Sequence, residues 1–369
     1  MRLALRELRR RPGRFVTATL ILLLIALLLM FLGGLVDGLI GNSTAAVRNQ
    51  AADLVVFSKD GKRSFLRSEI DAEVRANIQA VPGVTRTGGI GIAQLGARIP
   101  GKGPRDLADT ALFGYEIAPK GVPRTPPARG RAYADETLKN KGVKSGMTIA
   151  LGPFRTPILI VGFVSDTDYL GQGSLWASAD TWRDVTAANR AVSTLPAGSF
   201  QALVVSTSGT PTEVASRIDA ATRSTETLTV AAAADAIPGV KEQRSTFSQI
   251  IGVTVAIAVV VVALFFALLT VERTGLYGIL KAIGAKSGSL FAGVVLQAVI
   301  VSTIASVGGA ALSLLLQAVI PAGTIPFSVG PGRLLSSAAF MLLAALIGCA
   351  FSLRRVLKID PASAIGGSL

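Results

Sequence analysis

The sequence predicts an α-helical membrane protein with four transmembrane helices and a mixed α/β extracytoplasmic domain inserted between helices 1 and 2. Three observations predict this fold. The mean hydropathy is +0.54 and only 16% of the residues are charged, which is too apolar for a purely soluble chain. Four apolar runs are long enough to cross a bilayer. Between the first and second runs, the hydropathy drops over residues 38–245.

The first apolar run covers residues 15–36 and contains no charged residue. At ~1.5 Å per residue it is about 33 Å long, which is enough for a hydrocarbon core. A cleaved signal peptide is the alternative, but the run exceeds a signal core and residues 43–45 form a poor cleavage site. We therefore expect a retained helix, with residues 1–37 forming a basic amphipathic cytoplasmic segment and transmembrane helix 1.

The other runs cover residues 247–271, 290–320 and 334–353, so helices 2–4 are expected within 246–353. The spans contain no basic residue, and Asp37 is their single acidic residue, at the outer end of helix 1. Basic residues favour the cytoplasmic side. They occur before the first run, between the second and third, and in the tail 354–369, whereas 321–332 is uncharged. We expect a multi-pass protein of the cell inner or plasma membrane with both termini cytoplasmic and 38–245 outside.

The outer domain is predicted to be mixed α/β. Amphipathic patterns indicate helices at 69–80 and 212–222, the first ended by Pro82-Gly83. Segments rich in β-branched residues indicate strands at 52–57, 111–115, 147–151, 157–164 and 201–206. LVVFSKDG before SEIDAEVRANI resembles ALVVSTSG before TEVASRIDAAT, so the sequence allows two related lobes.

Several classes of chemistry are excluded by composition. There is no histidine, and the single cysteine is Cys349, so an intrachain disulfide, a zinc cluster and a Cys/His nucleophile are ruled out. No G-x-x-x-x-G-K-[ST] pattern occurs, so no phosphate-binding loop of that type is present. Asp166 and Asp168 could bind a cation, but two carboxylates in a turn are interpreted as solvated. No catalytic residue, bound cofactor or metal site is predicted.

The net charge of +14 does not indicate nucleic-acid binding, because the basic residues are not gathered into one binding face. They flank the apolar runs or are mixed with acidic residues: residues 38–245 hold 24 basic and 19 acidic residues. This small excess hints at anionic partners such as lipid headgroups.

The segment 272–286, between the second and third runs, places Leu276, Ile279, Leu280 and Ile283 on one helical face. Such a helix can lie on the membrane surface or dock into a groove of a partner. A plain interfacial connector is the simpler interpretation. Gly34 and Gly38 form a small-xxx-small step near the end of helix 1 and are a candidate dimer contact.

At this point the sequence resembles the MacB/FtsX-type permeases, also called type VII ABC transporters. ERTGLYGILKAIGAKSGSL resembles the family's R-E-x-G-I-x-K-A-I-G-A motif, although the chain has Glu272-Arg273 where Arg-Glu is commoner. LKIDPASAI resembles its Asp-Pro-x-x-Ala-[LI] ending, here Asp360, Pro361, Ala364 and Ile365. LALRELRRRPGR resembles its basic amino-terminal helix, and the order of one helix, an outer domain and three helices is the family's layout.

The resemblance implies a non-enzymatic membrane subunit, a homodimer or a heterodimer with a similar subunit, driven by two copies of a cytoplasmic ABC ATPase. ATP and Mg would bind that partner. The helix within 272–286 would contact the ATPase, and ATP-driven motion would reach the outer domains by mechanotransmission. The coupling residues implied are Glu272, Arg273, Gly275, Leu276, Gly278, Ile279, Lys281, Ala282, Ile283 and Gly284.

The size of the outer domain favours an exporter that moves an amphipathic substrate (lipid, haem, peptide or drug) from the outer leaflet or periplasm. Two alternatives from the same family stay open. One is an FtsX-like transmitter that activates a cell-wall hydrolase without transport, and the other is a lipoprotein-releasing permease. A periplasmic adaptor or hydrolase is a further partner to be expected, along with membrane lipids, whereas an unrelated sensor or receptor is disfavoured by the coupling motif.

Overall fold

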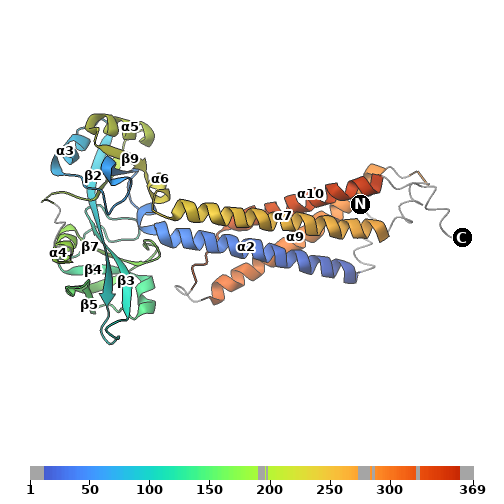
Figure 1. Ribbon diagram of the computed structural model, residues 1–369, viewed down its shortest axis with the longest axis horizontal. Helices are drawn as coiled ribbons and strands as arrows, with labels where there is room; N and C mark the ends of the chain where they lie inside the picture. Colours follow the sequence, from blue (N-terminus) through green and yellow to red (C-terminus); the bar gives the residue numbers. More distant parts are fainter. Residues whose placement is uncertain are drawn as a thin grey trace. The chain divides into compact units, whose positions relative to one another are not determined.

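The computed structural model describes residues 12–189, 196, 198–272, 283–284, 287–320 and 325–357. The chain divides into two compact units (Figure 1). The helical unit comprises Met1–Gly38 and Arg244–Leu369, and the α/β unit comprises Leu39–Gln243.

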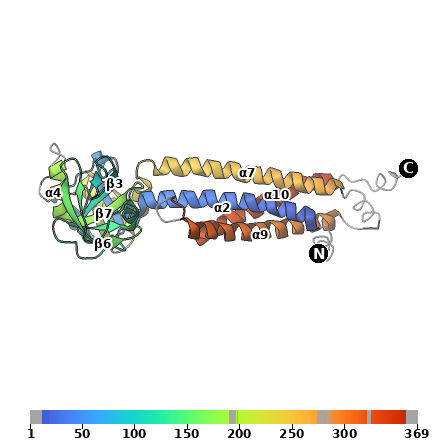
Figure 2. The same cartoon turned by 90° about the horizontal axis from the view of Figure 1, so that it is seen from below.

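Four long helices carry the apolar runs: α2 (Pro12–Arg48), α7 (Val240–Glu272), α9 (Ser287–Val319) and α10 (Pro331–Leu357). Within the described residues, these are the four helices long and apolar enough to cross a membrane. All four contribute to one core of mostly small side chains, and both views show them as a bundle (Figure 2). The predicted fold class is confirmed: four candidate transmembrane helices flank a mixed sheet domain.

Small residues allow the helices to approach closely. A Cβ added to Gly309 of α9 would lie 3.0 Å from the backbone nitrogen of Leu27, and one added to Gly348 of α10 would lie 2.8 Å from a Val262 methyl. Close packing of this kind is the usual source of helix association in a bilayer, where water does not drive apolar surfaces together.

The α/β unit contains one nine-stranded sheet in the order β3-β7-β4-β6-β5-β2-β8-β1-β9, with β3 also paired to β2. The strands are β1 (Leu54–Ser58), β2 (Val84–Arg98), β3 (Leu107–Tyr115), β4 (Arg131–Asp135), β5 (Thr148–Leu151), β6 (Thr156–Val164), β7 (Gly173–Ser178), β8 (Ala202–Thr207) and β9 (Thr225–Thr229). The shorter helices are α3 (Ala72–Gln79), α4 (Ala179–Asn189), α5 (Pro211–Thr222) and α6 (Val230–Asp235).

The pairing of β3 with β2 closes six strands into a ring, here called the barrel lobe (β2 to β7). Strands β8, β1 and β9 continue the sheet from the other half of β2, and with α3 and α5 they form the open lobe. Strand β2 belongs to both lobes, because Val84–Ile90 pairs with β8 while Ile90–Arg98 pairs with β3.

The predicted repeat lies within a single lobe. Its two copies correspond to β1 with α3 and to β8 with α5. Strands β1 and β8 are antiparallel neighbours, and Ile78 of α3 and Val214 of α5 belong to the same core cluster. The expectation that each copy forms its own lobe was therefore wrong, because the barrel lobe is inserted between the copies.

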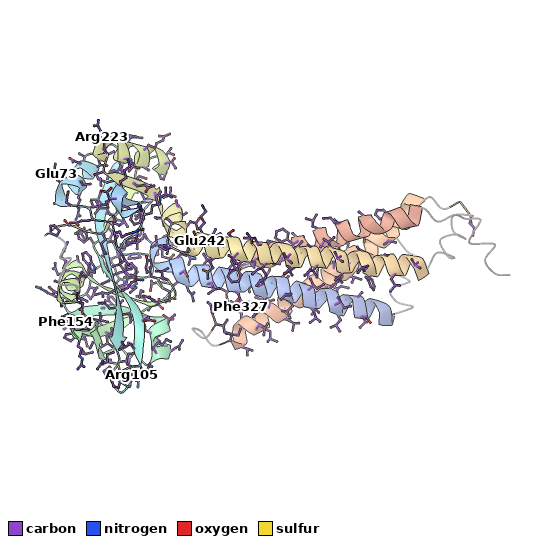
Figure 3. All side chains as sticks on the ribbon, viewed as in Figure 1. Glu73, Arg105, Phe154, Arg223, Glu242 and Phe327 are labelled. Carbon is purple, nitrogen blue, oxygen red and sulfur yellow. The ribbon has the colours of Figure 1, made fainter. Side chains whose placement is uncertain are left out.

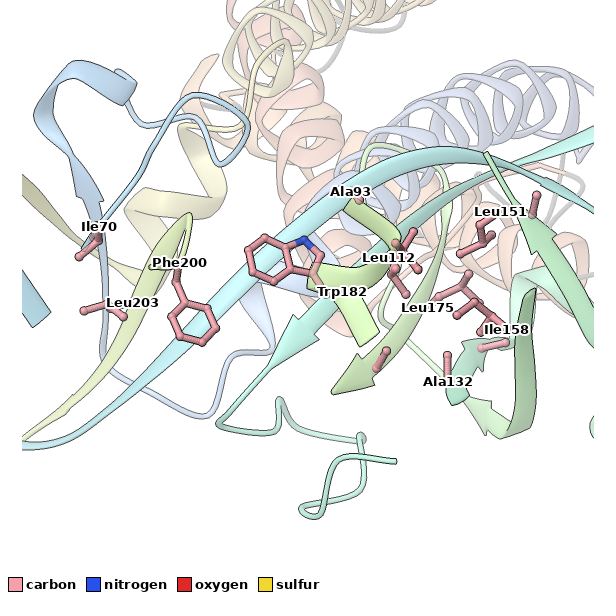
Figure 4. Close-up of a cluster of buried hydrophobic side chains, with 14 of the residues drawn as sticks. Ile70, Ala93, Leu112, Ala132, Leu151, Ile158, Leu175, Trp182, Phe200 and Leu203 are labelled. Carbon is pink, nitrogen blue, oxygen red and sulfur yellow. The ribbon is translucent and has the colours of Figure 1, made fainter. Parts of the chain in front are cut away.

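Both faces of the sheet are covered by buried side chains. Along β1, Leu54 and Val56 belong to one core cluster, while Val55 and Phe57 belong to the other. Figure 4 shows the first cluster, in which Trp182 of α4 stacks on Phe200 with ring centroids 6.0 Å apart.

Two glycines make room for that tryptophan. Gly91 of β2 and Gly114 of β3 are cross-strand partners. An added Cβ would lie 2.2 Å from Trp182 at Gly91 and 2.4 Å from it at Gly114. The ring occupies a slot that no other residue pair would leave open.

Candidate functional site

The predicted coupling residues lie largely outside the described residues. Glu272 is the last residue of α7, and Ile283 and Gly284 form a turn before α9. Ile283 is 79% exposed and Gly284 has a φ of +96°. The tail residues Asp360, Pro361 and Ala364 are outside the described part. So are the other coupling residues, which are Arg273, Gly275, Leu276, Gly278, Ile279, Lys281 and Ala282. Their role stays a prediction.

Gly34 and Gly38 pack against a segment of the same chain. An added Cβ at Gly34 would lie 2.5 Å from a Val329 methyl, and one at Gly38 would meet the carbonyl of Pro326. The backbone nitrogen of Ser328 donates to the carbonyl of Gly34 over 3.1 Å. Both glycines thus have an intrachain packing role, and the dimer contact stays a prediction.

The same segment leads to an ion pair that the sequence reading missed. Helix α10 begins at Pro331, so Arg333 lies inside a candidate membrane span. Its guanidinium donates to both carboxylate oxygens of Asp37, from Nε to Oδ2 over 2.8 Å and from Nη2 to Oδ1. The expectation that the spans hold no basic residue was wrong, because α10 begins three residues before the apolar run 334–353 and includes Arg333. The signal available in the sequence was an acidic residue at the end of one apolar run and a basic residue just before another.

The C-terminal end of α2 is hydrogen-bonded to the loop between β6 and β7. The α2 junction, as we call it, consists of residues 42–49 and the loop residues 166–171. Three backbone hydrogen bonds join them: Ala46 N to Asp168 O (3.0 Å), Leu170 N to Ser43 O (3.0 Å) and Gly171 N to Asn42 O (3.3 Å). These bonds hold the last two turns of the helix without relying on side chains.

Side chains reinforce the α2 junction. Arg48 Nη2 lies 3.0 Å from Asp166 Oδ1, and the Asn49 amide donates to Asp166 Oδ2 over 2.8 Å. Asp166 and Leu170 adopt φ values of +56° and +52°. Two non-glycine residues in the left-handed region of one short loop store strain that the surrounding contacts must offset.

A buried carboxylate pair lies beneath this loop. Asp135, at the end of β4, is 1% exposed and accepts hydrogen bonds from the backbone nitrogens and hydroxyls of Thr137 and Thr167. Asp168 is 7% exposed, and its Oδ1 accepts from the Thr137 hydroxyl over 2.9 Å. Burial, together with the neighbouring Asp135, raises the pKa of Asp168 to about 7.

The interpretation of both loop carboxylates as solvated is correct for Asp166, whose side chain is 62% exposed, and wrong for Asp168. Among the described residues no group of three or more metal-ligating side chains occurs.

The beginning of α7 is embedded in the same core as the end of α2. Ala46 and Val47 of α2, Ile237 before α7 and Val240 at its start all belong to the second core cluster of the α/β unit. The end of α2, which leads into the α/β unit, and the start of α7, which leads out of it, are thus packed in the same core. Because such cores resist deformation, a shift of either helix end must move the sheet or break contacts.

The sequence of this chain is similar to that of known membrane permeases. The family model "FtsX-like permease C-terminal" matches residues 249–361. The putative hemin transport system permease protein HrtB of Staphylococcus haemolyticus is 23% identical over 369 residues, covering 100% of this chain and 99% of the relative. An ABC transporter permease of Mycobacterium tuberculosis is 27% identical over 372 residues, covering 99% of both chains.

Two solved structures also show likeness. The periplasmic region of MacB from Actinobacillus actinomycetemcomitans is 11% identical with a TM-score of 0.35, covering 52% of this chain and 95% of that one. The extracellular domain of the transporter YknZ from Gram-positive bacteria is 11% identical with a TM-score of 0.33, covering 47% and 98%.

Proposed function

We propose that this chain, which is similar to FtsX-like ABC transporter permeases, is the membrane subunit of an ATP-driven exporter that works by mechanotransmission. In this proposal the chain hydrolyses no ATP itself. A cytoplasmic ABC ATPase, present in two copies, supplies the motion, and a second permease copy completes the assembly. The α/β unit lies outside the cell membrane and both termini lie in the cytoplasm.

The main observation in support of this proposal is that the end of α2 and the start of α7 are packed into the same hydrophobic core of the α/β unit. Helix α7 ends at Glu272, where the predicted coupling segment begins, and it starts at Val240 inside the core of the α/β unit. Its 33 residues correspond to about 50 Å of helix. A displacement at the coupling segment would therefore be delivered, through one continuous helix, to a sheet that cannot absorb it locally.

An exposed apolar stripe on α7 supports a partner in the membrane. Its members recur at intervals of three and four residues, the spacing of one helix face: Ile250, Val253, Ile257, Val260, Leu264, Leu268 and Val271. A face of this kind suits lipid chains or a second copy of the helix, and the proposed dimer would cover part of it.

For the substrate we propose an amphipathic molecule such as a lipid, haem, peptide or drug, taken from the outer leaflet or periplasm. One relative that aligns over the full chain is named a hemin transport permease, at 23% identity. This name supports an amphipathic cargo in general, and at 23% identity it does not single out haem.

The coupling step can be tested by placing charge on the apolar face of residues 272–286. Ile279→Asp should abolish co-purification with the cytoplasmic ATPase, because a carboxylate buried unpaired in a docking groove costs several kcal/mol. The measurement compares ATPase recovery and membrane abundance for the wild-type and variant proteins.

Tyr277→Ala is the matched control, since it trims the same segment without adding charge, and it should retain the ATPase. Normal abundance of Ile279→Asp with unchanged ATPase recovery and unchanged export would remove the coupling role from this segment.

A further inference from the structure

A cavity of about 540 Å³ lies on the α/β unit, and none of its lining residues belongs to the α2 junction. Its wall is built from the start of β2, the loop after β3 and the segment after α2. The lining includes Ala51, Arg86, Glu116, Ile117 and Arg124. Its volume is in the range of small-molecule sites, and its charged residues come from β2 and from the loop after β3.

The single acidic residue of the lining is already engaged. Glu116 binds Arg75 with both oxygens, at 3.2 Å from Nη1 to Oε1 and 2.7 Å from Nη2 to Oε2. Its Oε2 also accepts from the backbone nitrogen of Gly89 over 2.8 Å. Arg75 therefore compensates the charge of Glu116, which is not available to neutralise the other two arginines.

Arg86 and Arg124 carry the uncompensated charge of the cavity. Arg86 donates from Nη2 to the carbonyl of Ala51 over 3.3 Å, a neutral acceptor. In the part of the chain that the structure describes, neither guanidinium forms an ion pair with a carboxylate. The cavity thus presents two positive charges with most of their N–H donors unused.

Both arginines sit on backbone that is held in place. Arg86 lies on β2, where it is the cross-strand partner of Ser206 of β8. Arg124 follows Pro123, whose carbonyl accepts from the Tyr115 hydroxyl over 2.9 Å. Because the ring of Pro123 also restricts φ, the backbone that carries Arg124 loses little freedom when a ligand binds.

We propose that this cavity is a binding site for a ligand that bears a phosphate or carboxylate group, held by Arg86 and Arg124. Guanidinium groups bind both anions through paired N–H donors, and these charge-assisted bonds are about twice as strong as neutral ones. Ile117 and Ala118, which also line the cavity, offer apolar contact to the rest of the ligand. The site is independent of the proposed transport, since it needs only the α/β unit to be folded.

The cavity at the start of α7 offers a contrast. It has about 620 Å³ and is lined by Lys62, Arg63 and Lys241, but also by the acidic residues Asp235 and Glu242. Of these residues, Figure 3 labels Glu242. Arg63 is further paired with Glu226. Its positive charges are largely balanced, so it is the appropriate place for control substitutions.

The test uses the full chain in a neutral detergent and two probes, inorganic phosphate and dodecyl phosphate, with binding followed by titration calorimetry. Wild-type protein should bind at least one probe saturably. The double variant Arg86→Gln/Arg124→Gln should lose about tenfold or more in affinity, because each lost charge-assisted bond contributes more than a neutral one. Lys62→Gln/Lys241→Gln, with the same change in net charge, should bind within about twofold of wild type.

The probes distinguish the sources of the anion. Preference for dodecyl phosphate identifies an amphiphile headgroup, equal affinity identifies a free anion, and both outcomes support the site. If the double arginine variant does not fold, Arg124→Gln alone, on an exposed loop, replaces it. The proposal is overturned by the absence of saturable binding up to about 10 mM, by equal losses in the arginine and lysine variants, or by undiminished binding in the arginine variants.

Discussion

Asp168 shows how one loop residue can make the α/β unit sensitive to pH. Its carboxyl lies beside the buried Asp135 and shares the Thr137 hydroxyl with it. Two adjacent carboxylates with little access to water cannot both be charged without a large cost. A protonated Asp168 relieves that cost while its backbone carbonyl continues to hold Ala46 of α2.

The pH dependence has a defined sign. An aspartate in an unfolded chain has a pKa near 4, whereas that of Asp168 in the folded chain is raised to about 7. Between these values the folded chain binds more protons than the unfolded chain, so the free energy of unfolding falls as pH rises and levels off above about pH 7. Asp168→Asn, which stays neutral and can still accept from Thr137, should flatten this slope.

Tryptophan fluorescence measures this in the full chain, because both tryptophans, Trp176 and Trp182, lie in the α/β unit. Unfolding would be followed between pH 5 and 8. At pH 8 the Asp168→Asn variant should be more stable than wild type by up to a few kcal/mol. Asp166→Asn, at an exposed carboxylate, should keep the wild-type slope. Parallel slopes for wild type and Asp168→Asn would show that Asp168 is not protonated in the folded chain.

At the scale of the element, α2 is shaped by its glycines. Gly34 and Gly38 contact the segment 326–329, and the rings of Phe31 and Phe327 lie there with centroids 5.1 Å apart. Phe327 is labelled in Figure 3. The pairing of Asp37 with Arg333 closes the same contact. The end of α2 in the helical unit is thus a docking surface for the chain's own segment before α10.

A single added methyl group at Gly38 should break this contact. In Gly38→Ala the Cβ would meet the Pro326 backbone, which cannot move as a flexible side chain would, so we expect a cost of about 1–3 kcal/mol. Gly41→Ala is the control, because the atom nearest to its Cβ would be 3.9 Å away, on Arg48.

The native Cys349 provides the readout, since it is the only cysteine and is buried in the core of the helical unit. Its reaction with a thiol-specific fluorogenic dye during heating reports the unfolding of the bundle. The midpoint should fall by several degrees in Gly38→Ala and stay unchanged in Gly41→Ala. Equal midpoints for all three proteins would mean that the segment 326–329 does not pack on α2 in solution.

Helices and strands whose apolar residues recur at a regular spacing could be predicted from the sequence, and those defined by long-range packing could not. The segments of α3, α5, β1, β6 and β8 showed apolar patterns that the structure reproduces within a few residues. Strand β2, the longest, was missed because its glycines weaken any strand pattern, although Gly91 is there to admit Trp182. Helix α4 was also missed, because the space that holds its Trp182 is formed by β2 and β3, which are distant from α4 in the sequence.

The candidate site follows the same division. Asp166 and Asp168 were noticed as a pair, but only the fold brings Asp135 beneath them, from a strand 31 residues earlier in the chain than Asp166. Arg86 and Arg124 have no local pattern in common, and their convergence depends on where β2 passes the loop after β3. The coupling segment, by contrast, was predicted from its local sequence alone, and its role stays a prediction.

At the scale of the whole molecule, the proposed orientation can be tested by thiol labelling in intact cells. With Cys349 replaced by alanine, cysteines at Ser165 and Ser328, both exposed, should react with a membrane-impermeant reagent. Cysteines at Ser287 and Ser363 should react only after the cells are opened, because the basic residues around them favour the cytoplasm. Labelling of Ser287→Cys from outside would invert or refute the proposed topology.

The pairing of β1 with β8 has a consequence for biosynthesis. Strand β1 leaves the ribosome directly after α2, yet Leu54 pairs with Val205, about 150 residues later. At ~5–20 residues per second, β1 waits roughly 8–30 s for its neighbour. During that time Leu54, Val55, Val56 and Phe57, all buried in the finished fold, are uncovered. The strands of the barrel lobe are closer in sequence, so this lobe can close within that interval. The nascent chain then carries a folded barrel lobe and an unpaired apolar strand β1. At this stage β1 is exposed to aggregation and is the segment that a chaperone would protect.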